Sequence, residues 1–420
     1  MYKKKVMIRK VVIFSFAFFA HFLILLLLPE YAQAAKEIKN FEIDWILPQE
    51  YYQGNDFVNG RAWVQKERQS PWTLFDKEGN IIKDGVEADS IGEYNSDGYC
   101  RFLVTNDLKL EGFFDIEGNI IFPPDDALSI YELTEGLIRK KGENGLLGYI
   151  DVDKKWVIPP KYDKAGFFIG GLTLVQKGEK LWYIDENDNA IVDFNDRRLE
   201  GGSIFLNEVA FIKIDSKLAL INKKAEFLTA LEFDSFFNRV FGVRRFKEWD
   251  EMIGVSKNGK AGFIDLKGNL VLDFNYEIPP EKQILLGLYS FSNDRAVIVI
   301  SKEKFEFGVI DKTGKLLFTL PGDDRGRLFY PGKNVEKNTE LYKQLRRESG
   351  INAYIPSYIG DYLVSMNTDG VVVYDKDGNS YQLSKYLPID TIVYASEENI
   401  FRAERLYFGG NRYFKIKVKE

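Results

Sequence analysis

Histidine and cysteine are almost absent from this chain of 420 residues. The one histidine is His21 and the one cysteine is Cys100, so an intrachain disulfide is excluded. Zinc sites built from Cys and His are excluded as well, and so are Ser-His-Asp and Cys-His hydrolases of the usual form. Cys100 lies in an alternating strand pattern at 99–104, which favours a small buried apolar residue over a nucleophile. The residue types available therefore argue against an enzyme.

The longest apolar run lies at the N-terminus. Five basic residues within 1–10 precede an uncharged, almost wholly apolar stretch of 18 residues at 11–28, and Pro29 and Ala32-Gln33-Ala34 follow. This three-part layout predicts a signal peptide over 1–34, cleaved between Ala34 and Ala35. The run is also just long enough to span a bilayer, so an uncleaved membrane anchor is the alternative. We expect a secreted or extracellular protein, either free or associated with the cell envelope.

Basic residues are too few for a nucleic-acid binder. Residues 1–34 hold five basic residues and one acidic residue, so the mature chain keeps 52 basic and 62 acidic residues, a net charge of −10. Binding to phosphates requires clustered Lys and Arg, so an acidic exported chain is a poor nucleic-acid binder; a short basic cluster at 239–247 is expected to be a solvated face, or else a contact for an anionic wall polymer. No Gly-rich phosphate loop occurs either, so we expect no nucleotide cofactor.

Acidic turns at 185–189 and 375–379 resemble the start of a calcium loop. Such a loop carries a glutamate about twelve residues from its start, and Asp196 and Tyr386 stand at those places instead. Turn chemistry explains both segments without a metal. A pair of glycosidase carboxylates has no signature that would select it among so many acidic residues. A carboxylate-based, glycoside-processing enzyme on a propeller scaffold therefore stays an alternative.

A short pattern recurs along the chain: two apolar residues, Asp, two variable residues, Gly, a polar residue and an apolar pair. It is clear at 74–82, 113–121, 263–271, 309–317 and 373–381, where the last copy lacks the apolar pair, and weaker at 149–158, 183–192 and 220–228. The turn residues of the clear copies are Asp76, Gly79, Asp115, Gly118, Asp265, Gly268, Asp311, Gly314, Asp375 and Gly378. Asp bonds its own backbone two residues on, and Gly takes the left-handed conformation that follows a type I turn. Each copy is therefore predicted to be a hairpin tip.

The spacing of the copies predicts the fold class. Successive Asp-equivalent positions lie 34 to 64 residues apart, mostly near 40, and a second alternating strand pattern precedes each hairpin. Three or four strands per repeat at this period favour an all-β propeller of seven or eight blades in one domain over 35–420. The apolar faces of 41–47 and 414–418 allow the first and last strands to share one blade. An open β-solenoid or meander is the alternative.

Two copies carry a family resemblance. The segments GLLGYIDVDKKWVIPPKYDKAGFF (145–168) and GLTLVQKGEKLWYIDENDNAIV (171–192) resemble the WG (KWG-type) repeats of bacterial proteins. The resemblance covers roughly residues 50–320 well and 360–380 weakly. No copy keeps the intact Trp-Gly pair, although Gly112, Gly148 and Gly262 and Gly308 keep its second half. The family has no shared catalytic motif, so the resemblance implies a fold unit and assigns no site.

The longest gap, 64 residues between Asp311 and Asp375, contains an insertion at about 321–358. The helix signals there predict one short helix near 336–349. Leu341, Tyr342, Leu345 and Arg346 form its candidate partner contact. A tolerated surface insertion is the other interpretation.

Tryptophans at 63, 72, 156, 182 and 249 lie in or beside the repeat strands. We expect most of them in the core and a minority on a stacking surface for sugar or peptide. Together these features predict an exported, non-enzymatic binding or scaffolding protein. Its rigid β-repeat surface would serve a protein or a component of the cell envelope.

Overall fold

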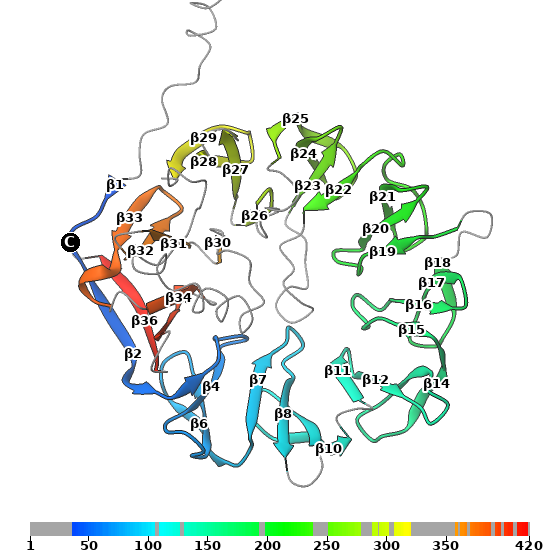
Figure 1. Ribbon diagram of the computed structural model, residues 1–420, viewed down its shortest axis with the longest axis horizontal. Helices are drawn as coiled ribbons and strands as arrows, with labels where there is room; N and C mark the ends of the chain where they lie inside the picture. Colours follow the sequence, from blue (N-terminus) through cyan, green and yellow to red (C-terminus); the bar gives the residue numbers. More distant parts are fainter. Residues whose placement is uncertain are drawn as a thin grey trace, which may run out of the picture.

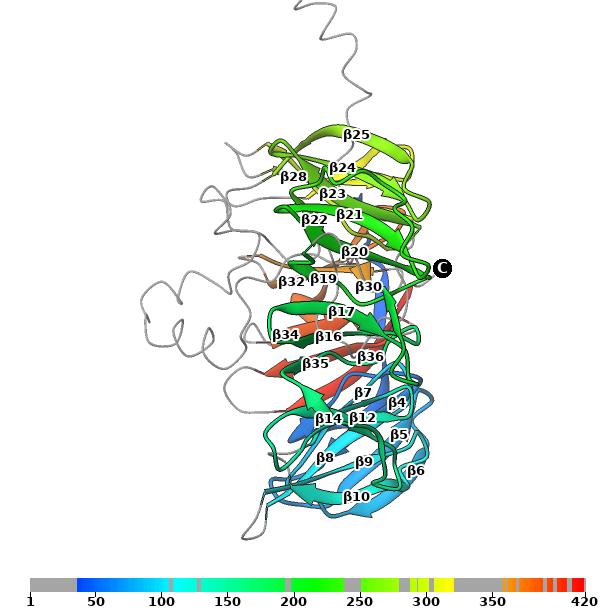
Figure 2. The same cartoon turned by 90° about the vertical axis from the view of Figure 1, so that its right-hand side faces the viewer.

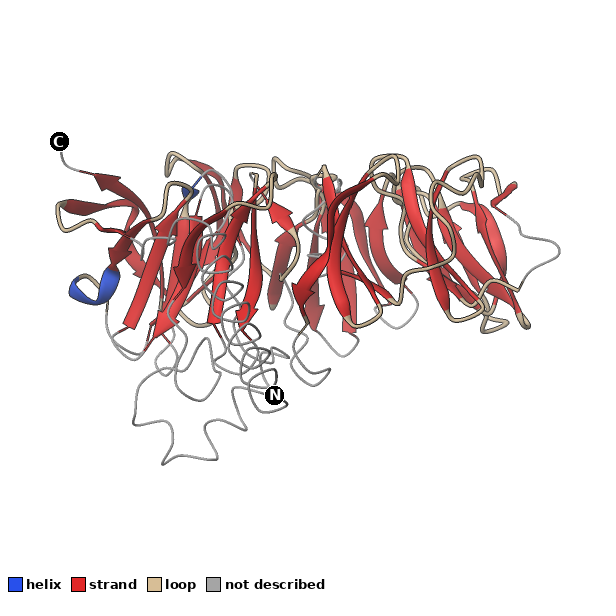
Figure 3. Cartoon of the chain, turned by 90° about the horizontal axis from the view of Figure 1, so that it is seen from above, coloured by secondary structure: helices blue, strands red, loops and turns tan. Residues whose placement is uncertain are grey.

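The chain forms a ring of β-sheet blades (Figure 1). In the other two views the strands run across the thickness of a disc (Figures 2 and 3). Within each blade the first strand lies toward the centre of the ring and the last toward the rim (Figure 1). This computed structural model describes residues 36–105, 109–126, 130–192, 198–237, 251–278, 288–292, 294–301, 306–320, 358–359, 362–367, 370–387, 391–395, 399–405 and 410–418.

The first four blades each contain four antiparallel strands. Blade 1 consists of β3 (Gln53–Gly54), β4 (Arg61–Gln65), β5 (Trp72–Asp76) and β6 (Ile81–Val86). Blade 2 consists of β7 (Ser90–Tyr94), β8 (Cys100–Thr105), β9 (Lys109–Phe114) and β10 (Ile120–Asp126). Blade 3 consists of β11 (Ile130–Thr134), β12 (Leu137–Lys141), β13 (Leu147–Ile150) and β14 (Trp156–Tyr162). Blade 4 consists of β15 (Lys164–Ala165), β16 (Thr173–Lys177), β17 (Lys180–Ile184) and β18 (Ala190–Val192).

The next three blades continue the ring. Blade 5 has three strands, β19 (Gly201–Gly202), β20 (Val209–Ile214) and β21 (Lys217–Asn222). Blade 6 consists of β22 (Ser235–Phe237), β23 (Met252–Lys257), β24 (Lys260–Asp265) and β25 (Leu270–Glu277). Blade 7 consists of β26 (Phe291–Ser292), β27 (Arg295–Ser301), β28 (Glu306–Asp311) and β29 (Leu316–Leu320). One residue pair, Glu277 with Val299, joins blades 6 and 7 into a single eight-stranded sheet.

The two ends of the described chain complete the last two blades. Blade 8 consists of β30 (Tyr358–Ile359), β31 (Tyr362–Asn367), β32 (Gly370–Asp375) and β33 (Asn379–Gln382), and β1 (Lys36–Glu37) adds to β33 in parallel. Blade 9 consists of β34 (Thr391–Ala395), β35 (Phe401–Arg405) and β36 (Asn411–Val418), and its outermost strand is β2 (Phe41–Tyr51). The 3-10 helix η3 (Leu383–Lys385) follows β33.

The predicted pairing of the first and last strands is confirmed. β2 runs antiparallel to β36, with Phe41 opposite Val418 and Ile43 opposite Ile416. The propeller fold is confirmed too, but the described strands form nine blades rather than the predicted seven or eight. The prediction counted Asp-Gly turns, and blade 9 has none at its outer edge because its two outermost strands come from opposite ends of the sequence.

The hairpin tips have the predicted turn chemistry. At Asp76 the carboxylate accepts the backbone N–H groups of Glu78 (3.0 Å) and Asn80 (2.8 Å), and the Asn80 amide donates to its other oxygen at 2.9 Å. Gly79 then takes a φ of +85°. Asp115, Asp265 and Asp375 repeat this set with Asn119, Asn269 and Asn379, while Asp311 uses Thr313 and Lys315.

The turn glycines also pack closely against the preceding blade. A Cβ at Gly79 would lie 2.7 Å from Ile46 O, and one at Gly378 would lie 2.8 Å from the Phe318 ring. A Cβ at Gly268 would collide with Leu228 O. The same glycine thus supplies a left-handed backbone and a close contact between blades.

Neighbouring blades share apolar cores all round the ring. Trp63 and Trp72 of blade 1 cluster with Tyr94 and Phe102 of blade 2. Across the closing seam, Leu47, Tyr51 and Tyr413 of blade 9 cluster with Phe57, Ala62, Val64 and Phe75 of blade 1. The largest cluster extends over blades 6 to 9. Burial of this repeated apolar layer holds the ring together.

Buried tyrosines form hydrogen bonds between neighbouring blades. The hydroxyl groups of Tyr149, Tyr183 and Tyr413 each donate to a carbonyl of the next blade, at 2.9 Å (Gly166 O), 2.6 Å (Ser203 O) and 2.8 Å (Asn55 O). Burial raises the pKa of all three, that of Tyr149 to about 12. These hydroxyls therefore stay protonated and keep donating at ordinary pH.

An ion pair crosses the same closing seam. The Arg402 guanidinium of β35 bonds the carboxylate of Asp56, which precedes β4, and both side chains are buried. Arg402 Nη1 also donates to Glu404 (2.9 Å) and Asn411 (2.8 Å). Burial alone would lower the pKa of Arg402, but the surrounding negative groups, Asp56 first, raise it. The guanidinium therefore remains charged inside the seam.

Several sequence predictions lie outside the described residues. These are the signal peptide with Ala34 and Ala35, the helix near 336–349 with Leu341, Tyr342, Leu345 and Arg346, and all of the insertion except its last residue. In the part of the chain that is described, no helix has the length and apolarity needed to cross a membrane.

Candidate functional site

An acidic residue stands directly before the first strand of four blades. The residues are Asp89, Asp163, Glu200 and Asp234, and each accepts a backbone N–H from the turn between the second and third strands of its own blade. The measured separations include 2.6 Å from Gly178 N to Asp163 and 2.7 Å from Asn258 N to Asp234. We call this arrangement the latch.

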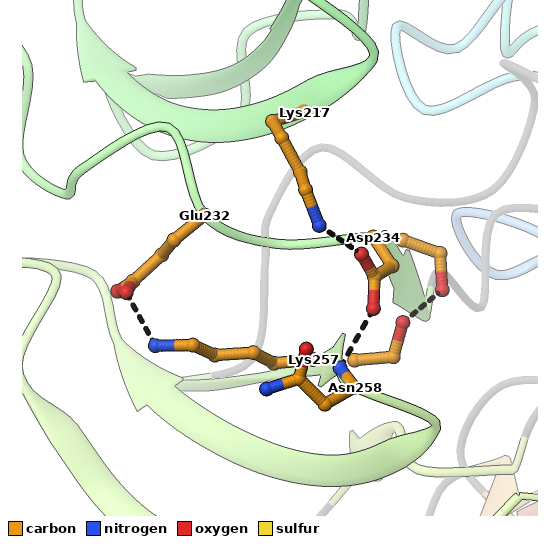
Figure 4. Close-up of polar contacts among 7 residues, drawn as sticks. Lys217, Glu232, Asp234, Lys257 and Asn258 are labelled. Atoms are coloured by element: carbon orange, nitrogen blue, oxygen red, sulfur yellow. Dashed lines mark hydrogen bonds and ion pairs between the residues drawn. The ribbon is translucent and has the colours of Figure 1, made fainter.

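The latch of blade 6 is the most elaborate (Figure 4). Lys217 of blade 5 pairs with one oxygen of Asp234, and Asn258 N–H donates to the other. Beside it, Lys257 Nζ lies 2.6 Å from Glu232 Oε2. The hydrogen bond from Lys217 is the largest cause of the lowered pKa of Asp234. These lysine and acidic side chains therefore form ion pairs with one another.

Blade 1 lacks the latch. The equivalent position is identified by its backbone, because Asp89 N, Asp163 N and Tyr52 N each donate to the last residues of their blade's second strand. In blade 1 that position holds Tyr52, whose ring cannot accept the turn N–H as a carboxylate does. The side chain of Tyr52 is 41% exposed.

The turn of blade 1 is braced by other means. Ser70 N donates to Glu67 O at 3.1 Å, and Ser70 Oγ bonds Glu67 O (2.9 Å) and Glu67 N (3.0 Å). From the strand below, the buried amide of Gln65 donates to Ser70 O at 2.7 Å. Gln69, within this turn, has a φ of +64°.

A cavity of about 400 Å³ lies beside Tyr52, between blades 1 and 2. We call it the notch. This volume lies within the range of small-ligand pockets, roughly 300–1,000 Å³. Its lining residues are Tyr52, Gln53, Gln65, Arg68, Gln69, Glu87, Ala88, Asp89, Val104 and Thr105.

Four polar side chains of the notch are uncommitted. Within the described structure, Gln53, Arg68, Gln69 and Glu87 form no side-chain hydrogen bond and no ion pair, and all four are exposed. Most polar side chains of the repeat signature, by contrast, are engaged within the ring. The notch therefore presents free donors and acceptors on a braced frame.

The notch does not have the geometry of a glycosidase. Its two carboxylates, Glu87 and Asp89, come from the same connection between β6 and β7. Asp89 is occupied by the Thr105 N–H. Glycoside hydrolysis uses two carboxyls that flank the scissile bond. Within this cavity no second free carboxylate faces Glu87.

The turn carboxylates are poor metal ligands because their oxygens already accept hydrogen bonds. Burial tends to raise the pKa of Asp76, Asp185 and Asp265, but the bonds from their turns, led by the Asn side chains, lower it. At Asp185 and Asp375, where the calcium pattern occurs, Asn189 and Asn379 bind the carboxylate. The described residues contain no group of three or more His, Cys, Asp or Glu that fits a metal ion.

The described tryptophans of the repeat strands differ in burial, and Trp182 is partly buried against the core shared by blades 3 and 4. Trp63 and Trp72 are fully buried, whereas Trp156, the first residue of β14, is 40% exposed. Equivalent first residues of outer strands are also exposed, Ile81 by 58% and Ile120 by 57%. Trp249 lies outside the described residues. Cys100 is buried, as expected of a structural residue.

Sequence reasoning identified the turns but missed the notch. The available signal was Pro159-Pro160-Lys161-Tyr162-Asp163, whose last residue is a latch acid. Aligning the residue before the first strand of blades 1, 2, 4, 5 and 6 would have shown that Tyr52 stands where the other four have an acid. That alignment requires strand boundaries, which only the structure provides.

Comparison with known proteins identifies one repeat directly. Residues 148–180, from β13 to the start of β17, match the family described as "WG containing repeat". The match includes Tyr149, Asp151 and the Asp163 latch. No protein of curated function matches the sequence.

Several solved structures are similar in fold. A eukaryotic initiation factor shares 10% identity with a TM-score of 0.47, covering 80% of this chain and 87% of that one. Sqt1 from Saccharomyces cerevisiae shares 9% identity (TM-score 0.35, 83% and 98% covered). Virginiamycin B lyase from Staphylococcus aureus shares 10% (TM-score 0.30, 90% and 100% covered). Similarities this low carry no functional inference.

Proposed function

We propose that this β-propeller, which contains one segment (148–180) that matches the WG containing repeat, is an exported, non-enzymatic binding protein. Its partner is a component of the cell envelope, bound in the notch between blades 1 and 2. One observation carries the proposal: in blade 1 Tyr52 stands in place of the latch acid, and it lines a cavity with four uncommitted polar side chains.

The walls of the notch are already held in place by hydrogen bonds, so few of their residues have to become ordered when a ligand binds. Gln65 and Ser70 brace the turn on one side, and the Asp89–Thr105 latch braces the other. A preformed site loses less conformational entropy when its ligand binds. The blades behind both walls share a buried aromatic core, which keeps the walls in register.

The export and non-enzymatic parts of the proposal rest on the sequence. The basic, apolar and Ala-x-Ala segments of residues 1–34 support export. The chain beyond residue 34 contains no histidine, and the carboxylates of the turns and latches accept hydrogen bonds within their own blades. A binding protein with a rigid β-repeat surface needs no catalytic histidine or cysteine, so this composition is compatible with it.

Co-sedimentation of residues 35–420 with isolated peptidoglycan and membrane fractions tests the proposal. We expect the protein to pellet with one of these envelope fractions. Arg68→Ala combined with Gln69→Ala should weaken binding at least about tenfold, a change equivalent to roughly 1.4 kcal/mol. Arg198→Ala is the matched control, because Arg198 is an exposed arginine whose ion pair with Glu179 spans 3.5 Å.

A second variant reconstructs the latch. Tyr52→Asp places in blade 1 the residue type found at this position in blades 2, 4 and 6. It should abolish binding without lowering thermal stability. Retention of the protein in the supernatant with every fraction contradicts the proposal, and so does binding that the notch variants leave unchanged. Export is checked separately, by finding Ala35 at the mature N-terminus by mass spectrometry.

A further inference from the structure

We propose that the ligand of the notch is an uncharged saccharide, an inference that rests on the proposed function and specifies its ligand class. Three features of the cavity point to this chemistry. Its carboxylates outnumber its one cation, its amides offer paired donors and acceptors, and an exposed aromatic ring stands at its wall.

The charge of the notch disfavours anionic ligands. Arg68 supplies one free cation and Glu87 one free anion, while the carboxylate of Asp89 is held by the Thr105 N–H. An anionic polymer would meet these two carboxylates against a single cation. The mature chain carries a net charge of −10, which adds a long-range repulsion against anions.

The polar groups of the notch suit a ligand with several hydroxyl groups. Gln53, Gln65 and Gln69 all line the notch, and each amide has a donor end and an acceptor end. Gln65 uses its NH₂ group on Ser70 O, so its oxygen is the end available for further bonding. A sugar hydroxyl also donates and accepts at once. Vicinal hydroxyls therefore fit amide, guanidinium and carboxylate groups simultaneously.

Tyr52 supplies the apolar surface that saccharides require. Its side chain is 41% exposed and lines the cavity. The C–H face of a pyranose is apolar, and a flat ring provides large contact area at a small cost in conformational entropy. The backbone bond from Tyr52 N to Lys66 O, 3.2 Å, fixes the residue at the wall.

Isothermal titration of the purified chain, residues 35–420, with tri-N-acetylchitotriose tests the inference. We expect binding that changes less than about twofold between 50 and 500 mM NaCl, because screening affects charged ligands and spares neutral ones. Tyr52→Ala should weaken binding roughly three- to tenfold, whereas Tyr52→Phe should keep it within about twofold. Glu87→Gln should retain partial binding. Polyglutamate and spermidine are the charged comparison probes.

The outcomes separate this inference from the proposed function. Notch-dependent pelleting with envelope fractions, together with failure of the trisaccharide and of longer uncharged chito-oligosaccharides to bind, overturns the saccharide inference alone. Tighter binding of polyglutamate or spermidine than of the glycans also overturns it. Absence of both pelleting and glycan binding overturns both. A circular dichroism spectrum unchanged by each substitution confirms that the variants are folded.

Discussion

Replacing Gly268 by alanine tests how the repeats hold the ring together. Gly268 has a φ of +86°, and Gly259, in the turn between β23 and β24 of the same blade, has a φ of +75°. An alanine at either position would destabilise the folded state by roughly 1–2 kcal/mol, because a residue with a Cβ disfavours the left-handed conformation. Part of it is offset because alanine restricts the unfolded chain by about 0.4–1 kcal/mol.

The two glycines differ in their surroundings. No atom lies within 4 Å of a Cβ built at Gly259. A Cβ at Gly268 would collide with Leu228 O and lie 2.8 Å from Thr229 Cγ2, both in blade 5. Overpacking of this kind costs a further 1–3 kcal/mol, roughly, because backbone must move. We therefore expect Gly259→Ala to destabilise by about 1 kcal/mol and Gly268→Ala by about 2–4 kcal/mol.

Urea unfolding followed by circular dichroism and tryptophan fluorescence measures this difference. The denaturant midpoint of Gly268→Ala should fall well below that of Gly259→Ala at a similar m-value. Equal midpoints would refute the reasoning, because the turn glycine would then serve local backbone geometry alone. The interblade role assigned to the repeat signature would be lost.

Three further outcomes are expected. Arg402→Met leaves Asp56 buried without its cation and should cost about 3–5 kcal/mol in urea unfolding, while adding Asp56→Asn should restore part of the loss; an unchanged midpoint would disprove the seam ion pair. Burial raises the pKa of the Tyr149 hydroxyl to about 12. The contribution of this protonated hydroxyl to the free energy of unfolding is therefore complete below pH 10 and disappears as the pH approaches 12. Tyr149→Phe should lose less stability between pH 10 and pH 12 than the unchanged protein does. The same dependence of stability on pH in both proteins would contradict this expectation. Ala225 has a φ of +62°, so Ala225→Gly should raise stability by about 1 kcal/mol, and a lower melting temperature would count against the turn assignment.

Local chemistry made the hairpins predictable. An Asp that bonds its own turn and a left-handed Gly leave a signature within a few residues, as Asp76 and Gly79 show. The weaker copies were also recognisable, although Lys154 and Ala225 take the left-handed position without glycine, at φ values of +65° and +62°. The pairing of 41–47 with the C-terminal strand followed from two alternating apolar faces.

The blade number and the notch depend on long-range assembly. Blade 9 was not counted because β2 and β36 meet without a turn between them. The notch was missed because its walls come from segments near 52, 68 and 88 that only the ring brings together. Tyr52 looks ordinary in the sequence. Its meaning appears only when the latch acids of the other blades are placed beside it.

Hydrogen–deuterium exchange with and without soluble peptidoglycan fragments tests the central claim most directly. That claim is that the repeat signature builds the frame and the notch binds the ligand. We predict slower exchange in 52–53, 65–70 and 87–89, with the hairpin tips, such as 76–80, unchanged. Protection confined to the tips or to other blades, with none at these three segments, would contradict the account.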